Sequence, residues 1–583
     1  MITTRKAKLL LRDAVKWYHK KGDTLSERNR AHIEQLMESL DEAIHNKEKA
    51  KIKELTPKLK AFLNEHKKTG VILWAFELAV ALVIALIIAI AIRQMWFELM
   101  VIPTGSMRPS FQENDHLTVS KATYGINYPL LPGHFYFDPD LIERTSAIIW
   151  SGDDLPQLVD SDSTFFGLFP YKKRYIKRLI GKPGDTLYFY GGKIYGIDKD
   201  GRELNELQES QVMQQLEHIP YTYFQDNLKQ VNQSYIFYHF NQKVGKSTPS
   251  IWGRPKIEVW DGEKWVNDQS PSSPSYGDWF GIKHFGKVRL TESDNDNETL
   301  ALEIYHHPTA EQNFQKSTIP LNKEHLDRIM DTLYTARFEV VDGRAMRYGS
   351  NMYASPNSFA DVPDGVYEFY YGKAYRIGIK GWKEELPEDH PLYARTPKNI
   401  LRLFNDGIDF HPRVRDSLQV SEQNMPTRFA YFRDGDLYLM GSPILKKDDP
   451  TLEAFVEKEE EKDAPFIDHG PPTSDEILKY GVKVPDTHYL VLGDNHAMSL
   501  DSRSFGFVPE GNLRGTPSVL IWPPSPRWGP VNHPDSKVFT TSRLIVWAIA
   551  AAFLLTYLIY KRRSLQYPIF KKNRTSKRLI AKK

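Results

Sequence analysis

The sequence of 583 residues contains no cysteine. This absence excludes disulfide bonds, cysteine nucleophiles and thiolate-bound metals, so a body of this size has to rely on its packed core. With 41% hydrophobic and 12% aromatic residues, the chain has an ordinary globular composition and can bury sizeable cores. Its length allows two to four domains.

Several motifs of common enzyme classes are incomplete or absent. Gly245-Lys-Ser-Thr248 is similar to the end of a phosphate-binding loop, but Phe240 occupies the position of the required glycine. The sequence has no HExxH motif, and His306 and His307 lack a third ligand at a useful spacing. A Gly-x-Ser-x-Gly elbow is also missing. These gaps disfavour metalloprotease and α/β-hydrolase interpretations, and we expect no metal and no organic cofactor.

Positive charge is concentrated at the two ends of the chain. Residues 1–70 carry 17 Lys/Arg against 10 Asp/Glu, and residues 561–583 carry 10 Lys/Arg and no acidic residue. Because the whole chain has a net charge of only +3, the region between them is strongly acidic. Basic ends indicate either nucleic-acid-binding tails or a membrane topology signal. The hydrophobic runs favour the second, so we expect no nucleic-acid partner.

Two apolar runs are candidates for membrane-spanning helices. Residues 71–92 are apolar apart from Glu77, and residues 544–560 form a shorter apolar and aromatic run. The alternative for each is a buried core helix. Basic residues precede the first run and follow the second, which predicts two spans at 71–93 and 544–560, with both termini cytoplasmic and the intervening region outside. The first run starts too late for a cleaved signal peptide.

Residues 1–70 have helical periodicity. Leu36, Leu40 and Ile44 recur at four-residue steps, and Pro57 predicts a turn. We expect a basic cytoplasmic region of two or three amphipathic helices. These helices either lie against the membrane or a partner, or form a small solvated domain, and the second option is the simpler one.

Residues 94–540 are predicted to be mainly β. Short runs of aromatic and aliphatic residues recur there between glycines and prolines. The segments Tyr188–Tyr195, Phe369–Tyr375 and Tyr431–Tyr438 each read as a strand, a Gly turn and a strand, which predicts three hairpins. Stretches near 268–276 and 447–474 are predicted to be loops or linkers.

Four blocks of this region carry the chemistry. They are Val101–Phe111, Asn114–Ile126, Tyr175–Asp185 and Tyr489–Pro509. In the first block, Ser106 lies beside Gly105 on a turn stiffened by prolines. In the third, strand alternation places Lys177 on the same face as Tyr175 and Leu179. Apolar neighbours can desolvate an amine and lower its pKa, which makes a lysine a usable general base.

In this order and behind an anchor, the four blocks resemble those of bacterial type I signal (leader) peptidases, which are serine proteases with a Ser/Lys dyad. The resemblance implies a β-barrel-like catalytic domain that docks on the membrane. It also implies the following roles: Ser106 as nucleophile, Lys177 as general base, Thr104 and the Ser106 N–H as oxyanion donors, Ser499 as the residue that orients the lysine, Asp494 with Arg178 and Asp501 with Arg503 as supporting pairs, and Met100, Ile102, Met107, Phe111, Tyr175 and Ile176 as substrate-pocket residues.

The chain departs from the family pattern in three places. His496-Ala-Met498 replaces the usual Arg-Asp-Asn, residues 127–175 do not align, and about 300 residues separate the third block from the fourth. Apart from the resemblance, Asp494 and Asp501 could be ordinary turn residues, and Ser499 could be a helix cap.

The expected order of domains follows from these features. We predict a cytoplasmic helical region (1–70), an anchor (71–93), the first part of the catalytic domain (94–204), a β-rich insertion domain (205–480), the second part of the catalytic domain (481–535), a second span (544–560) and a basic cytoplasmic tail (561–583).

The resemblance implies an enzyme of the cytoplasmic membrane, with its catalytic domain on the extracytoplasmic side, that removes signal peptides with small residues at positions −1 and −3 from exported preproteins. The lipid bilayer is the second expected partner, and contact with the secretion machinery is left open. One alternative is a related Ser/Lys protease with a narrow substrate set. The other is a non-catalytic, membrane-tethered binding protein.

Overall fold

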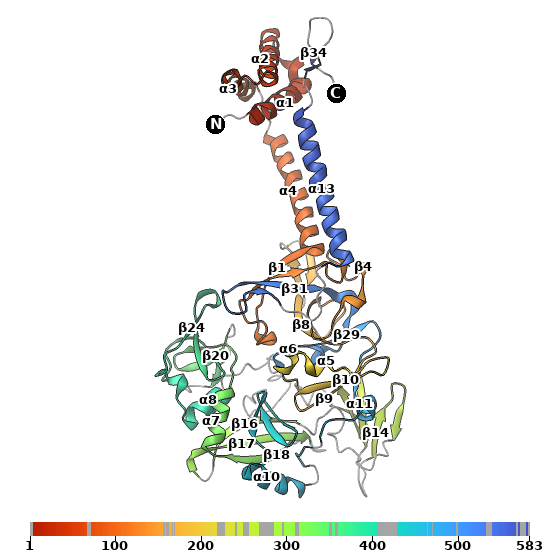
Figure 1. The fold of residues 1–583 in the computed structure, drawn as a ribbon, viewed down its shortest axis with the longest axis vertical. Helices are drawn as coiled ribbons and strands as arrows, with labels where there is room; N and C mark the ends of the chain where they lie inside the picture. The colour runs from red at the N-terminus through yellow and green to blue at the C-terminus, as the bar shows by residue number, and fades with distance from the viewer. Residues whose placement is uncertain are drawn as a thin grey trace. The chain divides into compact units, whose positions relative to one another are not determined.

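The computed structural model divides the chain into two compact units (Figure 1). Unit 1 comprises Met1–Ala91 and Arg543–Lys583, and unit 2 comprises Ile92–Ser542. The structure describes residues 4–66, 71–155, 158, 162–165, 167, 169–218, 228–239, 242–248, 256–267, 285–293, 296–308, 314–348, 353–355, 359–405, 428–462, 465–468, 470–496, 499–531, 539–566, 570–571 and 579–580. The predicted loop at 268–276 lies outside these residues.

Unit 1 begins with three amphipathic helices, which confirms the predicted N-terminal helical region. They are α1 (Thr4–Lys21), α2 (Glu27–His45) and α3 (Lys49–His66). Their apolar faces meet in one buried cluster that includes Leu11, Ile33 and Leu59. The turn predicted at Pro57 is wrong, because α3 continues through that residue. Packing of the apolar face outweighs the hydrogen bond that proline removes from a helix.

Two long apolar helices have most of their residues in the same unit. They are α4 (Val71–Met95) and α13 (Thr541–Gln566), and the short strands β33 (Phe570–Lys571) and β34 (Leu579–Ile580) pair beyond α13. The segments Ala75–Met95 and Thr541–Tyr560 are long and apolar enough to cross a membrane, and almost none of their apolar side chains is buried. An exposed apolar surface of this length is unfavourable in water and suits lipid.

Unit 2 is dominated by strands, which confirms the prediction of a mainly β protein. Its largest sheet has eight strands in the order β1-β2-β31-β5-β8-β29-β30, with β32 paired to β31. The strands are β1 (Phe97–Val101), β2 (His116–Ser120), β5 (Ala147–Ser151), β8 (Arg174–Gly181), β29 (His488–Leu492), β30 (Val508–Pro509), β31 (Leu513–Trp522) and β32 (Gly529–Pro530). Strands from the two ends of the unit therefore interleave in one sheet.

The three predicted hairpins are all confirmed. They are β9 (Thr186–Tyr190) with β10 (Lys193–Ile197), β22 (Gly365–Tyr370) with β23 (Lys373–Ile377), and β25 (Phe429–Arg433) with β26 (Asp436–Leu439). Each turn has two residues with positive φ, the second of which is Gly192, Gly372 or Gly435. Such turns match the natural twist of paired strands, and glycine adopts them without steric cost.

The remaining strands of unit 2 form smaller sheets. Strand β28 (Val482–Lys483) joins the first hairpin. A five-stranded sheet follows the order β11 (Leu228–Val231), β12 (Ser234–His239), β13 (Gln242–Thr248), β14 (Lys256–Trp260) and β15 (Trp265–Asn267). One six-stranded sheet runs β18 (Phe314–Leu321), β17 (Asp296–Pro308), β16 (Phe285–Ser293), β25, β26 and β27 (Ser442–Leu445). The other runs β21 (Tyr353–Ser355), β20 (Arg344–Arg347), β19 (Phe338–Val341), β22, β23 and β24 (Lys383–Glu385).

Short helices and two-stranded pairs complete the unit. The pairs are β3 (Gly125–Asn127) with β4 (His134–Phe137), and β6 (Asp162–Phe165) with β7 (Phe169–Lys172). The helices include α5 (Glu206–Glu209), α6 (Gln211–Gln214), α7 (Lys323–Thr332), α8 (Pro397–Asn405), α10 (Pro450–Glu460), α11 (Ser474–Tyr480) and α12 (Ser502–Phe505). Helix α10 corrects the loop predicted at 447–474, because Asp449 caps its start and Pro450 fits its first turn.

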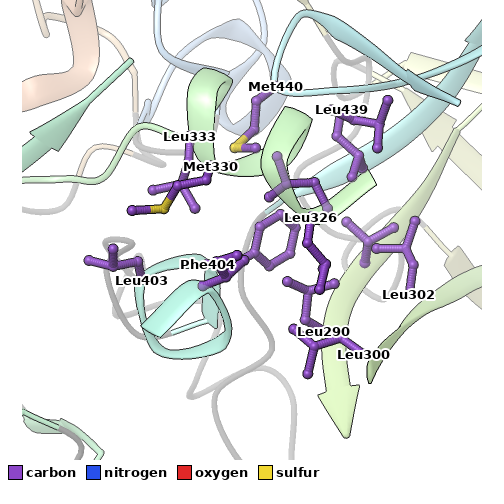
Figure 2. Close-up of a cluster of buried hydrophobic side chains, with 14 of the residues drawn as sticks. Leu290, Leu300, Leu302, Leu326, Met330, Leu333, Leu403, Phe404, Leu439 and Met440 are labelled. Carbon is purple, nitrogen blue, oxygen red and sulfur yellow. The ribbon is translucent and has the colours of Figure 1, made fainter. Parts of the chain in front are cut away.

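The largest buried cluster lies among the later strands and helices of unit 2 (Figure 2). It joins Leu290 and Leu302 of the β16–β17 pair to Leu326 of α7, Phe404 of α8 and Leu439 of β26. The strands between residues 285 and 445 therefore have their own apolar core, while the eight-stranded sheet contributes to three smaller clusters.

Gly515 offers a test of the eight-stranded sheet. Its φ is +142°, and a Cβ there would lie 1.9 Å from the carbonyl oxygen of Ser120. We expect Gly515→Ala to lower the free energy of unfolding by about 2 kcal/mol or more, because backbone must move between β2 and β31. Thermal unfolding followed by circular dichroism measures this. Gly511→Ala is the control, since its Cβ would be 3.5 Å from the nearest atom, and equal melting temperatures for the two variants would contradict the strand arrangement.

Candidate active site

Ser106 lies in the loop of residues 102–115 that joins β1 to β2, called the serine loop below. A short 3-10 turn over Gly105–Met107 carries it, and Ser106 is buried with Met107. Asn495, just after β29, holds this turn from the other end of the chain. Its backbone N–H donates to the Ser106 carbonyl at 3.1 Å, and its side-chain amide donates to the Gly105 carbonyl at 3.3 Å.

Lys177 lies in the middle of β8, a strand flanked by β5 and β29. The amine is 4% exposed, and its Nζ donates to Ser106 Oγ at 2.8 Å. Burial lowers the pKa of Lys177 to about 8, although Asp501 and Asp494 act in the opposite direction. The structure thus brings the two predicted catalytic side chains into direct contact and supplies the desolvation that a lysine base needs.

The two predicted Arg–Asp pairs lie near Lys177. Arg178 Nε and Nη2 donate to the Asp494 carboxylate at 2.6 and 2.5 Å. Arg503 Nε and Nη2 donate to Asp501 at 2.8 and 2.7 Å, and Asp501 also accepts from the Gly493 N–H at 2.8 Å. Burial would raise the pKa of Asp501, but Arg503 lowers it, so the carboxyl stays ionised. Each carboxylate near Lys177 therefore has its own arginine.

Ser499 is buried beside the same loop. Its side chain packs on Gly493, where a Cβ would lie 2.1 Å from Ser499 Oγ and 2.6 Å from the Ser106 carbonyl oxygen. Its nearness to Asp501 helps to lower the pKa of that carboxyl. Among the described residues no hydrogen bond joins Ser499 to Lys177, so its lysine-orienting role stays a prediction. Ala497 and Met498, named above as departures, lie outside the described residues.

A groove with a volume of about 510 Å³ opens over the dyad. Thr104, Ser106 and Lys177 line it, with Met100 and Tyr175 on its sides. Thr104 is exposed, and its Oγ1 lies 3.5 Å from Ser106 Oγ. Charged residues also line the groove: Arg93, Glu98, Lys173 and Arg174.

Four residues predicted to line the pocket lie elsewhere. Ile102, Met107, Phe111 and Ile176 belong to a buried cluster with residues such as Leu117. Strand alternation explains the split in β8, because Ile176 pairs with Ile149 of that cluster while its neighbours Tyr175 and Lys177 face the groove. Of the six predicted pocket residues, the structure thus brings Met100 and Tyr175 to the groove.

Sequence reasoning missed a second set of polar residues near the serine loop. His496 is buried, with Nδ1 3.5 Å from Oε1 of Glu217, and burial lowers the pKa of His496 to about 4. Glu217 also accepts hydrogen bonds from Tyr431 at 2.7 Å and Tyr334 at 3.2 Å. The departure at His496 was the one sequence signal for this cluster. Within the described residues, no three His, Asp or Glu side chains gather to hold a metal ion.

Comparisons with known proteins point to one family. The chain matches the model of the family described as "Signal peptidase, peptidase S26" over residues 75–250 and 426–522. It is 36% identical over 118 residues to "Signal peptidase I" of Rickettsia massiliae, which is 20% of this chain and 41% of the relative. Identity reaches 56% over 46 residues (8% and 21%) with "Probable signal peptidase I-2" of Synechocystis sp. and 51% over 47 residues (8% and 25%) with "Mitochondrial inner membrane protease subunit 2" of Danio rerio. The matched parts span less than half the length of these relatives.

The lowered pKa of Lys177 predicts how the reactivity of Ser106 depends on pH. An ammonium cannot accept a proton, so the rate of Ser106 acylation by a serine-directed covalent probe should rise with pH as Lys177 loses its proton. We expect the midpoint near pH 8, well below the value of about 10.4 for an ordinary lysine. Lys177→Met should abolish this rise of the rate with pH, called the pH limb below. A midpoint above pH 10 in the unmodified protein would contradict a desolvated amine.

Proposed function

We propose, from its resemblance to the signal peptidases of the peptidase S26 family, that this chain is a membrane-bound serine endopeptidase that removes N-terminal signal peptides from exported preproteins. The observation that carries the proposal is the 2.8 Å contact between Lys177 Nζ and Ser106 Oγ, two buried residues that line the same groove. A serine is a weak nucleophile unless a neighbouring base takes its proton.

The proposed reaction is acyl transfer in two steps. Neutral Lys177 accepts the proton of Ser106 as Oγ attacks the carbonyl carbon of the scissile peptide bond. The Ser106 N–H and the Thr104 hydroxyl stabilise the negative charge on the carbonyl oxygen. Lys177 then gives its proton to the leaving amine, and a water that it activates next releases the acyl group from Ser106.

We propose that the groove takes a peptide with small side chains at positions −1 and −3 before the cleaved bond. Met100 and Tyr175 stand beside the dyad and narrow the space there. A large side chain at position −1 would clash with them. A lysine there would lose its hydration, and Glu98, the carboxylate that lines the groove, is already paired with Arg93, Lys121 and Arg174. We therefore propose small residues such as alanine at −1 and −3.

The location of the site suits a substrate held in a membrane. Helix α4 ends at Met95, and β1 begins at Phe97, so ten residues of chain separate the end of the apolar helix from Ser106. We propose that α4 and α13 span the cytoplasmic membrane, with unit 2 on the extracytoplasmic side and both termini in the cytoplasm. The basic flanks of the two helices support this orientation.

Hydrolysis of one preprotein tests the proposed activity. The purified full chain in detergent should cleave a precursor with Ala at −1 and −3, and should leave the same precursor with Lys at −1 intact. Ser106→Ala and Lys177→Arg should both be inactive while still folding and inserting, the second because a guanidinium does not deprotonate in proteins. Cleavage by Lys177→Arg that still needs Ser106 would exclude lysine as the base. If the unmodified chain cleaves no exported precursor, the proposed activity is wrong and the alternative of a non-catalytic binding protein is favoured.

Reporter fusions test the proposed topology. A reporter joined after residue 70 or residue 583 should read as cytoplasmic, and one inserted in an exposed turn such as that at Gly201 should read as exported. The physical reason is the bias of Lys and Arg toward cytoplasmic flanks. An exported C-terminus would contradict the two-span arrangement and leave α13 as an interfacial helix.

A further inference from the structure

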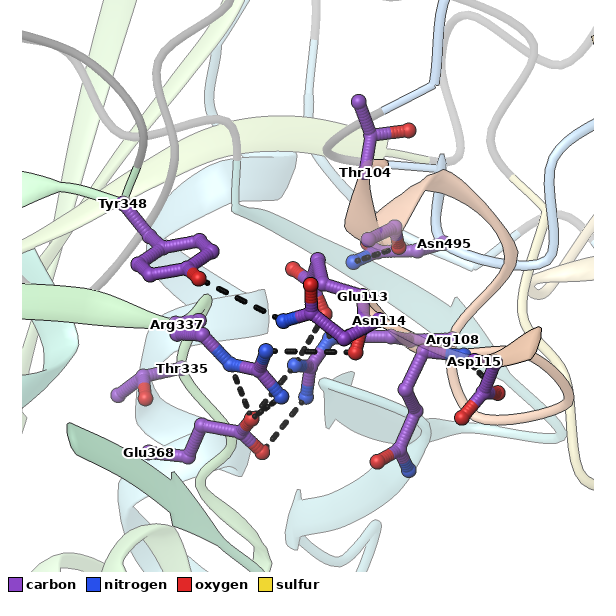
Figure 3. Close-up of polar contacts among 12 residues, drawn as sticks. Thr104, Arg108, Glu113, Asn114, Asp115, Thr335, Arg337, Tyr348, Glu368 and Asn495 are labelled. Carbon is purple, nitrogen blue, oxygen red and sulfur yellow. Dashed lines mark hydrogen bonds and ion pairs between the residues drawn. The ribbon is translucent and has the colours of Figure 1, made fainter. Parts of the chain in front are cut away.

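Arg108 lies two residues after Ser106, on the serine loop, and is 4% exposed (Figure 3). Its guanidinium fills the space between two carboxylates. Nε donates to Glu113 Oε2 at 2.8 Å, and Nη1 and Nη2 donate to the two oxygens of Glu368 at 3.0 and 2.8 Å. The first carboxylate belongs to the serine loop itself, whereas the second lies 260 residues further along the chain.

Glu368, on β22, is fully buried and accepts hydrogen bonds from three positively charged side chains. Besides Arg108, it accepts from Arg337 Nε and Nη2 at 2.8 and 2.6 Å, and from Lys383 Nζ at 2.6 Å. Burial alone would raise the pKa of the Glu368 carboxyl, but these cations hold it well below its usual range. The carboxylate is therefore a permanent charge that has no access to water, and each of its hydrogen bonds is charge-assisted.

Other contacts join the same two regions around this carboxylate. Arg337 Nη1 donates to the Glu113 carbonyl at 3.3 Å, and the Asn114 side chain donates to Tyr348 Oη at 3.4 Å (Figure 3). Gly381 lies so close that a Cβ there would be 2.9 Å from Asn114 Cβ. The serine loop is thus bound at three successive points: at Arg108, at Glu113 and at Asn114.

All the partners of the serine loop in this network come from a part of the chain that the family match does not cover. Residues 251–425, called the unmatched segment below, include Arg337, Tyr348, Glu368 and Lys383. Elsewhere the loop is held by Asn495, which lies in the matched parts and binds Ser106, and by Arg527, which lies just beyond them and whose Nη1 donates to Asp115 at 2.6 Å. The side of the loop at Arg108 depends on the unmatched segment.

We propose that Glu368 is a positioning residue for Ser106, acting through Arg108, so that the unmatched segment is a structural component of the active site. This inference rests on the proposed nucleophilic role of Ser106. Glu368 touches neither Ser106 nor Lys177. It fixes the guanidinium that anchors the chain two residues beyond the nucleophile, and Arg108 cannot keep its position without a carboxylate on that side.

Physical reasons make this contact important for the dyad. The proposed proton transfer requires Ser106 Oγ to stay within hydrogen-bond distance of Lys177 Nζ, and a displacement of about 1 Å can lower a rate about 10²-fold. Without the Glu368 carboxylate, the charge of Arg108 would be poorly compensated in a low-dielectric site. The serine loop would lower this energetic cost by moving Arg108 toward water. Such movement would also admit water to Lys177, whose lowered pKa depends on burial.

Glu368→Gln in the full chain tests the proposal, because the amide keeps the shape of the carboxylate and removes its charge. We expect kcat for a precursor with Ala at −1 and −3 to fall about 10²-fold with KM changed less than threefold. The pH limb of kcat/KM should also move upward from about 8, toward the value of an ordinary lysine. A loss of stability alone would leave the pH limb in place, so the limb separates positioning from folding.

Glu459→Gln is the matched control. Glu459 is 2% exposed and accepts hydrogen bonds from Lys462 and Phe466 rather than from the serine loop. We expect this variant to keep the kcat and the pH limb of the unmodified chain, even if its melting temperature falls. Glu368→Asp, which restores the charge on a shorter side chain, should recover part of the lost kcat.

Arg108→Lys decides the question if Glu368→Gln does not fold. Lysine keeps the charge but lacks the planar fork that bridges Glu113 and Glu368, so the same loss of kcat and the same shift of the pH limb are expected. A folded variant of either kind with the kcat and pH limb of the unmodified chain would overturn the proposal. Failure of the proposed function looks different, because the unmodified chain would then show no cleavage that depends on Ser106.

Discussion

The burial of one amine governs the arrangement of the site. Lys177 lies on a strand with a neighbour on each side, which removes water and lowers its pKa. Two buried carboxylates nearby would return it to the charged form if they stood alone. Asp494 and Asp501 instead share their charge with Arg178 and Arg503 through two hydrogen bonds each, so the surroundings of the lysine are close to neutral.

The same constraint explains why the serine loop is tied down from several directions. In the proposed mechanism, the desolvated Lys177 can act only while Ser106 stays against it, and the backbone of Ser106 is held by Asn495 on one side. Ser499 and the Ser106 carbonyl both crowd Gly493, which leaves no room for a side chain there. The bonds between Arg108 and Glu368 complete this enclosure from a sheet that the family match does not cover.

The strands between residues 285 and 445 contact the rest of unit 2 at several places rather than at one. Strand β25, which the family match includes, pairs with β16, which it does not. The turn of the β25–β26 hairpin meets the turn of the β9–β10 hairpin, where Arg433 Nε donates to the Gly191 carbonyl at 2.6 Å. Tyr190 and Gly435 also share the carboxylate of Asp468, at 2.7 Å each. Polar contacts of this kind fix the register between hairpins from distant parts of the chain.

Local signals made part of this structure predictable from sequence. The apolar helices, the three hairpins with their glycine turns, and the neighbours of Lys177 on β8 are all encoded within a few residues of each other. The contact between Arg108 and Glu368 could not be found in this way, because 260 residues separate them and a single arginine or glutamate is usually a surface residue. For Ile176 the sequence did hold a signal: the alternation that puts Lys177 on the face of Tyr175 puts Ile176 on the opposite face, whereas its pocket role was taken from the family resemblance.

The order of strands in the large sheet has a consequence for how the protein is made. Strand β31, which ends at Trp522, lies between β2 and β5, so the sheet cannot close until the chain up to Trp522 has left the ribosome. Arg178 meets Asp494 across 316 residues, and Gly105 meets Asn495 across 390. Contacts at such separations form slowly, because long loops must close before any contact stabilises them. A chain whose translation stops before β31 therefore carries Ser106 and Lys177 but not their enclosure, and the two side chains reach their final surroundings only after β31 has been made.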